Sequence, residues 1–287
     1  MRISGNTRIC GVFGWPVRHS LSPPMQQAAF DALNLDWAYL PFAVAPENLE
    51  RALRALPALG MAGVNCTIPH KESTCAIVNQ VDAQAAAIGA VNTVTVLEDG
   101  RLEGMNTDAR GFVDSLRLDG GFEPADRTVV MIGTGGAGRA MAFGLADAGV
   151  SELILVNRTL ERAERLAEDL HAYRKINVRA VKRGAEEEVA ALAQADLLVN
   201  ASSLGLHDVD TLPADPAHLR SDAAVYDAVY TPQWTPLLQA ASMRGLKTIP
   251  GLGMLARQGA IAFERWTGQK PDVQLMIDTL KMELAAR

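Results

Sequence analysis

The stretch TVVMIGTGGAG, residues 128–138, decides the fold of this chain of 287 residues. An apolar run, Thr128–Ile132, has the length of a buried strand, and the pattern G-x-G-x-x-G follows it directly. Gly133 permits a tight turn, Gly135 lets the backbone approach a pyrophosphate, and Gly138 lets the following helix pack closely on the strand. Free N–H groups at the start of that helix attract phosphate. The stretch therefore predicts a strand–loop–helix unit that binds a dinucleotide; the alternative is a glycine-rich turn without a ligand.

The end of the next expected strand, residues 153–157, indicates which dinucleotide binds. An NAD site needs an Asp or Glu there to bond the ribose 2′-hydroxyl. This strand ends instead in Asn157-Arg158-Thr159, without a carboxylate. Arg158 can bind a 2′-phosphate and stack on adenine, Thr159 adds a hydroxyl and caps the helix, and Arg162 can add further charge. The sequence favours NADP; the alternative is that Arg158 is a solvated surface side chain.

Outward from this unit, short apolar runs alternate with helical stretches, which is the pattern of an α/β protein with parallel sheets. A chain of 287 residues is long enough for about two domains. Strands are expected in the first part at 8–14, 37–44 and 62–67, with a hairpin of 91–97 and 101–106, and in the second part at 128–132, 153–157, 176–181, 196–200 and 223–227. Helices are expected at 23–33, 46–59, 137–148 and 160–170, and from near 69, 251 and 271.

The composition argues against several classes of protein. Hydrophobic residues make up 48% and charged residues 21%, which is typical of a folded globular protein. The net charge of −6 and the lack of a dense basic run argue against a nucleic-acid partner. The longest charge-free stretches are too short and too polar to span a bilayer, and no signal peptide is visible. Three cysteines are too few for a disulfide framework, and no Cys/His cluster has metal-ligand spacing, so we expect a cytoplasmic protein without a metal.

Polar side chains gather where the strands of the first part end, a common location for sites in α/β proteins. They are Ser20, Ser22, Asn65, Thr67, Asn92, Thr93, Asn106 and Thr107. Hydroxyl and amide groups in this number suit a hydroxyl-rich ligand, and Lys71 with Asp108 forms the most plausible titratable pair. Each member has a structural alternative, since Ser22 and Asp108 could cap helices and Lys71 could be solvated.

Several ordered motifs resemble those of the shikimate dehydrogenase family, over nearly the whole chain. They are GWPVRHSLSP (14–23), NCTIPHK (65–71), GAVNT (89–93), NTD (106–108), the glycine loop, NRT (157–159), NAS (200–202), YTP (230–232) and GMLARQG (253–259). The resemblance implies reversible reduction of 3-dehydroshikimate to shikimate by NADPH, a step in chorismate and aromatic amino acid biosynthesis.

The resemblance also implies an organisation into two α/β domains, with the active site in the cleft between them. Residues 1–108 with 251–287 would form the substrate-binding catalytic domain, and residues 109–250 a Rossmann-type NADP-binding domain. The expected partner is the small-molecule substrate, shikimate or 3-dehydroshikimate, and a homodimer is a possible assembly.

By the family pattern, Lys71 and Asp108 are the catalytic pair. The residues implied to hold the carboxylate and hydroxyls of the substrate are Ser20, Ser22, Thr67, Asn92 and Gln258, with Tyr230 nearby. The residues implied to bind NADP are Gly133, Gly135, Gly136, Ala137, Gly138, Asn157, Arg158, Thr159, Arg162 and Gly253.

Two departures from the commonest family pattern concern substrate breadth. Many relatives carry histidine where this chain has Gln26, and valine where it has Cys66, whose thiol we expect to point into the core. A broader quinate/shikimate dehydrogenase that also uses NAD therefore stays open as an alternative. A non-catalytic, ligand-binding relative is the second alternative, against which Lys71 and Asp108 both argue.

Overall fold

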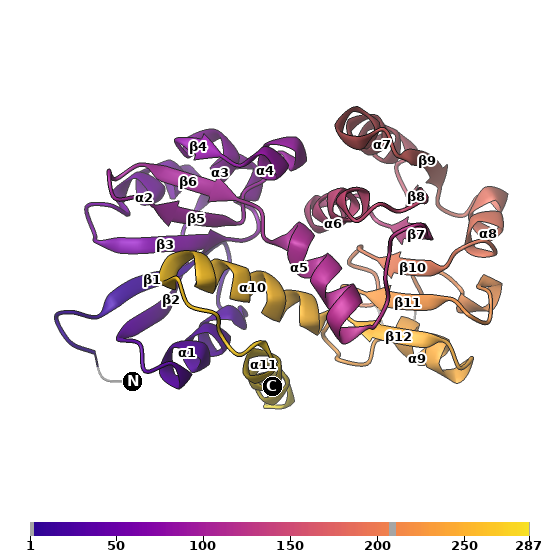
Figure 1. Ribbon diagram of the computed structural model, residues 1–287. Coiled ribbons are helices and arrows are strands. Elements are labelled where there is room, and N and C mark those ends of the chain that lie inside the picture. The colour runs from indigo at the N-terminus through magenta and orange to yellow at the C-terminus, as the bar shows by residue number, and fades with distance from the viewer. Residues whose placement is uncertain (1–2, 207–210, 287) are drawn as a thin grey trace. The chain divides into compact units, whose positions relative to one another are not determined.

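The computed structural model describes residues 3–206 and 211–286 (Figure 1). The chain divides into two compact units, Met1–Thr107 with Leu255–Arg287, and Asp108–Met254. The boundaries expected from the sequence lie at 108 and 250. Within the described ranges, no helix is long and apolar enough to cross a membrane.

The first unit holds a six-stranded sheet in the order β2-β1-β3-β5-β6-β4. Its strands are β1 (Arg8–Gly14), β2 (Trp37–Ala43), β3 (Met61–Cys66), β4 (Gln80–Val81), β5 (Thr93–Val96) and β6 (Leu102–Met105). The sheet is mixed, because β5 runs antiparallel to both β3 and β6 while the other strand pairs are parallel. The predicted hairpin is the cause: a short turn with Gly100 at φ +81° can join only antiparallel neighbours.

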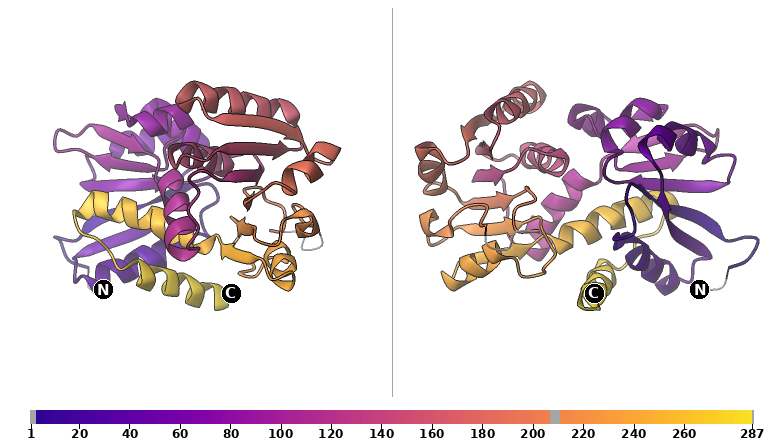
Figure 2. Two further views of the ribbon diagram at one scale, coloured as in Figure 1. Left: turned by 45° about the vertical axis from the view of Figure 1, so that its right-hand side comes forward. Right: turned by 180° about the vertical axis from the view of Figure 1, so that it is seen from behind.

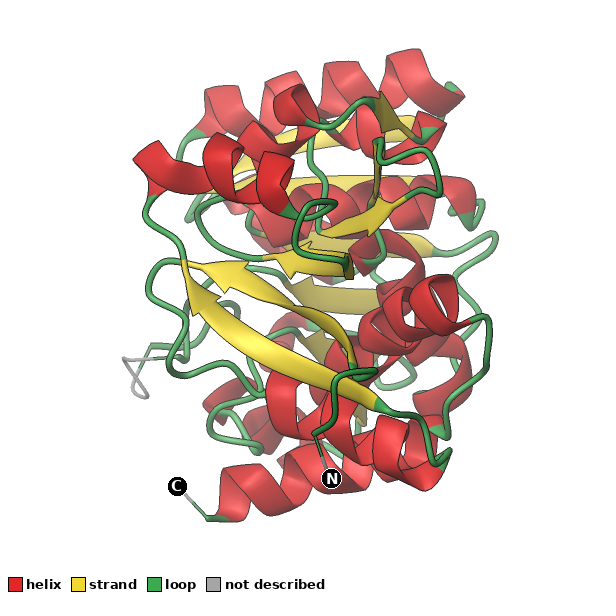
Figure 3. Ribbon diagram, turned by 90° about the vertical axis from the view of Figure 1, so that its left-hand side faces the viewer, coloured by secondary structure: helices red, strands yellow, loops and turns green. Residues whose placement is uncertain are grey.

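Helices flank this sheet (Figure 3). They are α1 (Ser22–Ala32), the 3₁₀ turn Pro46–Asn48, α2 (Leu49–Ala55), α3 (Lys71–Ile77), α4 (Ala83–Ile88), α10 (Leu252–Thr267) and α11 (Val273–Ala285). The predicted apolar face of Leu49, Leu53 and Leu56 is buried in the core, together with Cys66 of β3. Because the units divide after Met254, α10 begins in the second unit and continues in the first.

The second unit holds a fully parallel sheet in the order β12-β11-β10-β7-β8-β9. Its strands are β7 (Thr128–Ile132), β8 (Glu152–Asn157), β9 (Asn177–Lys182), β10 (Leu197–Asn200), β11 (Ala224–Asp227) and β12 (Lys247–Pro250). This is the strand order of a Rossmann fold, with its reversal between β7 and β10. The α/β fold class with a Rossmann-type unit is therefore confirmed.

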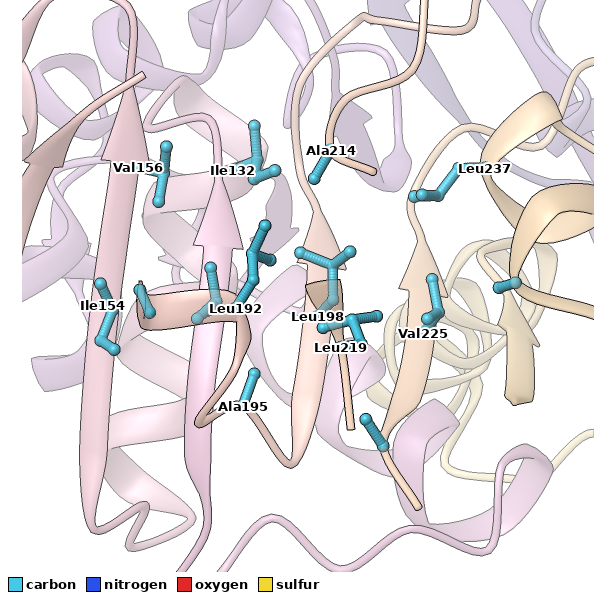
Figure 4. Close-up of a cluster of buried hydrophobic side chains, with 14 of the residues drawn as sticks. Ile132, Ile154, Val156, Leu192, Ala195, Leu198, Ala214, Leu219, Val225 and Leu237 are labelled. Carbon is cyan, nitrogen blue, oxygen red and sulfur yellow. The ribbon is translucent and has the colours of Figure 1, made fainter. Parts of the chain in front are cut away.

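The helices of the second unit are α5 (Asp108–Asp114), the π-helical turn Ser115–Asp119, α6 (Gly136–Asp147), α7 (Leu160–Arg174), α8 (Glu186–Leu192), the 3₁₀ turn Pro216–His218 and α9 (Pro236–Met243). Helix α7 lies along β8 and β9 (Figure 2). One buried cluster spans four neighbouring strands through Ile132, Val156, Leu198 and Val225 (Figure 4). This continuous apolar core holds the carboxyl ends of the strands, and the loops that follow them, in fixed positions.

Candidate functional site

The glycine loop after β7 is shaped by one backbone turn. Gly133 has φ +97°, a left-handed conformation that side chains disfavour, and its N–H donates to the Val156 carbonyl at 2.9 Å. A Cβ at Gly133 would also lie 2.8 Å from the backbone nitrogen of Ser202. Glycine is therefore required here by the turn and by the packing of the loop after β10.

The middle of the loop is open. Gly135, Gly136 and Ala137 are exposed, and a Cβ built at either glycine would meet nothing within 4 Å. Gly135 is the N-cap of α6 and has no side chain to cap it, so the first N–H groups of this 12-residue helix keep their donor capacity. An open glycine cradle before an uncapped helix start fits a pyrophosphate.

Close packing requires glycine at position 138, because a Cβ on Gly138 would overlap the Gly133 carbonyl oxygen and lie 3.3 Å from the Ala201 Cβ. Alanine normally stabilises a helix over glycine by about 1 kcal/mol. We expect the opposite for Gly138→Ala, a lower Tm and a KM for NADPH raised by about tenfold, since the loop must shift. Thermal unfolding and initial rates measure both effects.

The matched control is Gly136→Ala, which changes the same helix where space is open and should not lower Tm. A Gly138→Ala protein as stable as the Gly136→Ala protein would show that the loop tolerates the side chain, contrary to this prediction.

The segment after β8 gathers positive charge. Arg158 and Arg162 are both exposed, and among the described residues neither guanidinium forms an ion pair. Thr159 is the N-cap of α7, but its hydroxyl makes no capping bond, so that predicted role is wrong. The turn is held instead by the Asn157 carboxamide, whose Nδ2 donates to the Thr159 carbonyl at 2.8 Å. No acidic side chain follows the strand at 158–160.

A buried carboxylate, Asp227, organises the loops after β10 and β11. It accepts hydrogen bonds from Asn200 Nδ2 at 2.8 Å, Val229 N at 3.0 Å and Thr235 Oγ1 at 2.6 Å. Burial raises its pKa, and these three bonds act in the opposite direction. Half-buried Tyr230 lies in the loop that Asp227 holds. Asp227 is not among the site residues expected from the sequence, although an Asp at the end of a buried apolar strand is a detectable signal.

Gly253 is buried near the start of α10, within the second unit. A Cβ there would overlap the Asp119 carboxylate and lie 2.7 Å from Ser115 Oγ, both of which belong to the π-helical turn after α5. Glycine therefore lets the start of α10 pack directly on that turn.

In the first unit, Asn92 is the centre of a buried amide and hydroxyl network. Its Oδ1 accepts from Thr107 N at 2.8 Å and from Thr93 Oγ1 at 3.0 Å, which orients the carboxamide. Its Nδ2 donates to Thr107 Oγ1 at 3.0 Å. Thr107 Oγ1 in turn contacts Gln258 Oε1 at 3.3 Å, and Gln258 Nε2 donates to the Leu255 carbonyl at 2.9 Å. The structure thus joins Asn92 and Gln258, which are far apart in the sequence.

Three hydroxyls lie at the carboxyl ends of neighbouring strands β1 and β3. Ser20 Oγ accepts from the Ser22 backbone N–H at 3.3 Å, and the Thr67 N–H donates to the Phe13 carbonyl at 2.9 Å. All three side chains are partly exposed. Ser22 is the first residue of α1, whose N-cap is Leu21, so Ser22 is not a capping side chain.

Lys71 is the first residue of α3, half-buried, and its carbonyl accepts from Val91 N at 2.9 Å. A cation at a helix N-terminus opposes the helix dipole, so the position of Lys71 is not explained by helix stability.

Burial raises the pKa of the neighbouring Cys66 thiol to about 12, although a Thr74 hydrogen bond and the Lys71 charge lower it. Cys66 thus lies inert in the core, as predicted.

His70 has a structural role. It is buried, its Nε2 lies 2.8 Å from the Val44 carbonyl, and burial lowers its pKa, so it is a neutral structural donor.

Asp108 is 6% exposed at the first position of α5, in the second unit with Tyr230 and the glycine loop. Within residues 3–206 and 211–286, no group of His, Cys, Asp and Glu side chains could hold a metal ion.

Known proteins resemble this chain throughout. Residues 12–94 match the shikimate dehydrogenase substrate binding domain, 120–206 match shikimate / quinate 5-dehydrogenase, and 251–281 match the shikimate 5′-dehydrogenase C-terminal domain. A shikimate dehydrogenase (NADP(+)) from Rubrobacter xylanophilus is 47% identical over 284 residues, which cover 98% of each chain.

Solved structures agree with these matches. Shikimate 5-dehydrogenase from Thermus thermophilus, in complex with NADP(H) and shikimate, superposes with a TM-score of 0.86 at 40% identity, covering 96% of this chain and 99% of that one. Quinate dehydrogenase from Corynebacterium glutamicum, in complex with NAD, superposes with a TM-score of 0.89 at 32% identity, covering 96% and 99%. With matches of this extent, the chain belongs to the shikimate dehydrogenase family.

Proposed function

We propose that this protein is an NADP-dependent shikimate dehydrogenase, which reversibly reduces 3-dehydroshikimate to shikimate. The observation that carries the proposal is a division of tasks between the two units. Hydroxyls, amides and Lys71 gather at strand ends in the first unit, while an open glycine cradle and two arginines, neither ion-paired within the described ranges, gather in the second. The former suits a polyhydroxylated acid, and the latter suits a phosphorylated dinucleotide.

The proton chemistry falls to Lys71. NADPH, when bound, supplies a hydride to the carbonyl carbon of the substrate. The oxygen of that carbonyl then carries the negative charge, and the Lys71 Nζ donates a proton to it, which completes the hydroxyl. In the oxidation direction the neutral amine accepts the same proton. By the family pattern, Asp108 is the second member of the proposed catalytic pair, and it is the first residue of α5.

The remaining polar groups of the first unit orient the substrate. The contacts of Asn92 use both lone pairs of its Oδ1 and one N–H, which leaves its second N–H to donate to a substrate oxygen. Ser20, Ser22 and Thr67 offer hydroxyls from adjacent strand ends, and the Gln258 carboxamide extends the set from α10. Tyr230, which is half-buried in the second unit, is a further substrate contact that the family pattern implies. Such a set recognises a ring carboxylate and hydroxyls by direction as well as by charge.

The residues proposed to hold NADP all belong to the second unit. The loop from Gly133 to Gly138, with Ala137, would receive the pyrophosphate, and Gly253 is a further cofactor contact that the family pattern implies. Asn157 holds the turn that carries Arg158 and Thr159, and Arg162 lies within the first helical turn beyond it. The two guanidiniums would neutralise a 2′-phosphate.

The working compartment is proposed to be the cytoplasm. Cys10, Cys66 and Cys75 are all free thiols, which suits a reducing environment.

The experiment that tests the function compares kcat/KM for shikimate and quinate with both NADP and NAD. We expect shikimate with NADP to give the highest value of kcat/KM, because NAD lacks the 2′-phosphate that the two arginines would bind. An equal or higher value with quinate would replace the proposal by the broader quinate/shikimate dehydrogenase. If the protein binds shikimate but shows no turnover with any of the four combinations of substrate and cofactor, it is a non-catalytic relative.

A further inference from the structure

Tyr39 lies inside the first unit and is not among the site residues expected from the sequence. It belongs to β2 and is 3% exposed, with its ring centroid 6.2 Å from that of Trp266. Its hydroxyl donates to Asn65 Oδ1 at 2.7 Å, so one buried oxygen joins β2 to β3. Burial raises the pKa of the phenol, and hydrogen bonding by the Ser22 side chain acts in the opposite direction, which places Ser22 beside the phenol.

The partners of Asn65 determine the direction of each of these bonds. Asn65 Nδ2 donates to the Asn92 carbonyl at 3.2 Å and to Thr93 Oγ1 at 3.0 Å. Because a carbonyl can only accept, the carboxamide oxygen of Asn65 must face the phenol, which then has to donate. Burial raises the pKa of Tyr39 well above its ordinary value, so the phenol keeps this proton. The Tyr39 oxygen keeps its acceptor capacity, and the Ser22 hydroxyl is the neighbouring donor whose hydrogen bonding lowers the pKa of the phenol.

Tyr39 is thereby linked to both sides of the proposed substrate site. It binds Asn65 directly, and Asn65 anchors the backbone of Asn92. On its other side it offers an acceptor to the Ser22 hydroxyl, whose hydrogen bonding lowers the pKa of the phenol. β2 and β3 lie on opposite sides of β1, so the phenol reaches across β1 to bind Asn65.

We propose that Tyr39 is a positioning residue for the substrate, one that sets the orientation of Ser22 and of the Asn65–Asn92 pair. The proposal rests on the shikimate dehydrogenase function above. Without the phenol oxygen, the Ser22 hydroxyl would rotate freely and Asn65 Oδ1 would be buried without a donor. Substrate binding would then have to order both groups, whereas the reacting carbonyl and Lys71 would be unaffected.

The test is Tyr39→Phe, which removes a single oxygen. We expect KM for shikimate to rise about fivefold to tenfold, the effect of losing one or two hydrogen bonds, while kcat changes by less than about twofold. The KM for NADP should stay unchanged. Calorimetric titration of the protein with shikimate alone should show the same weakening. Thr279→Val is the matched control, since it removes another buried hydroxyl of the same unit, bonded only to the Leu275 carbonyl within α11.

A double-mutant cycle with Ser22→Ala separates positioning from general support. If Tyr39 acts partly through Ser22, the rise in KM caused by Tyr39→Phe should shrink in the Ser22→Ala background. An unchanged KM, or a variant that fails to fold, would make Tyr39 purely structural and overturn the proposal. An equal rise in both backgrounds would overturn the part that concerns Ser22 and assign the whole effect to the Asn65–Asn92 pair. A wild-type protein that neither binds nor oxidises shikimate would instead refute the proposed function, which the wild-type titration reveals before any variant is made.

Discussion

Lys71→Met is expected to lower kcat for shikimate oxidation by about 10²–10⁴-fold, the usual contribution of a positioned acid or base. Methionine keeps the length and much of the volume of the lysine side chain but can neither hold nor release a proton. The KM for NADP should remain near the wild-type value, because the proposed cofactor residues belong to the other unit. Initial rates in both directions, with each substrate varied in turn, measure these quantities.

Two further variants define what such a loss means. Lys281→Met makes the same chemical change at an exposed position of α11, where the ammonium pairs with Asp278 at 3.1 Å, and should leave turnover intact. Lys71→Arg keeps the charge but does not give up its proton, so it should be nearly as impaired as Lys71→Met. A Lys71→Arg enzyme close to wild type would mean that charge alone is needed, and turnover preserved in Lys71→Met would remove the amine from the mechanism.

The dinucleotide unit could be read from the sequence because its local signals agree. The apolar run Thr128–Ile132 is β7 with the same bounds, and the glycines that follow satisfy three separate requirements, for a turn, for open space and for close packing. The end of β8 at Asn157 was also predicted correctly, but the Thr159 hydroxyl does not cap α7 as expected. That error arose because Asn157, two residues earlier, holds the turn through a side-chain bond that no propensity predicts.

The first unit was harder to predict because its shorter elements depend on tertiary contacts. β4 has two residues and α4 has six, and neither has a hydrophobic period long enough to detect. The segment expected as one helix at 46–59 begins with a 3₁₀ turn, and its α-helical part ends before Pro57.

Links between single side chains of the polar network also depend on tertiary contacts, so local sequence does not predict them. Asn92 and Gln258 could be proposed by family resemblance, but their link through Thr107 depends on the return of α10 to the first unit. Tyr39 could not be found in this way, since a tyrosine in an apolar strand looks like any core aromatic. Its role follows from the pairing of β2 and β3 with β1, which brings it to Asn65, 26 positions further along the chain.

The second large effect is expected on the KM for NADPH, at the arginine proposed to bind the 2′-phosphate. Arg158→Ala is expected to raise the KM for NADPH by about 10- to 100-fold, the loss of one or two charge-assisted hydrogen bonds, while the KM for NADH changes little. Only the former carries the 2′-phosphate, and no carboxylate at 158–160 is available to bind a ribose hydroxyl instead. Steady-state rates with each cofactor at saturating shikimate or 3-dehydroshikimate measure the ratio.

The matched control is Arg165→Ala, one helical turn beyond Arg162, where the guanidinium bonds to the Glu161 carbonyl at 3.2 Å and the residue is exposed. It removes the same charge from the same helix and should change the ratio less than twofold, because charges on a solvated surface are screened over about 10 Å. Arg162→Ala should fall between the two if it assists Arg158. Equal losses with both cofactors would instead assign Arg158 to stacking on adenine, since that ring is common to NADPH and NADH. The discrimination would then have to come from Arg162 or from the Thr159 hydroxyl, whose freedom from capping leaves it available to a phosphate.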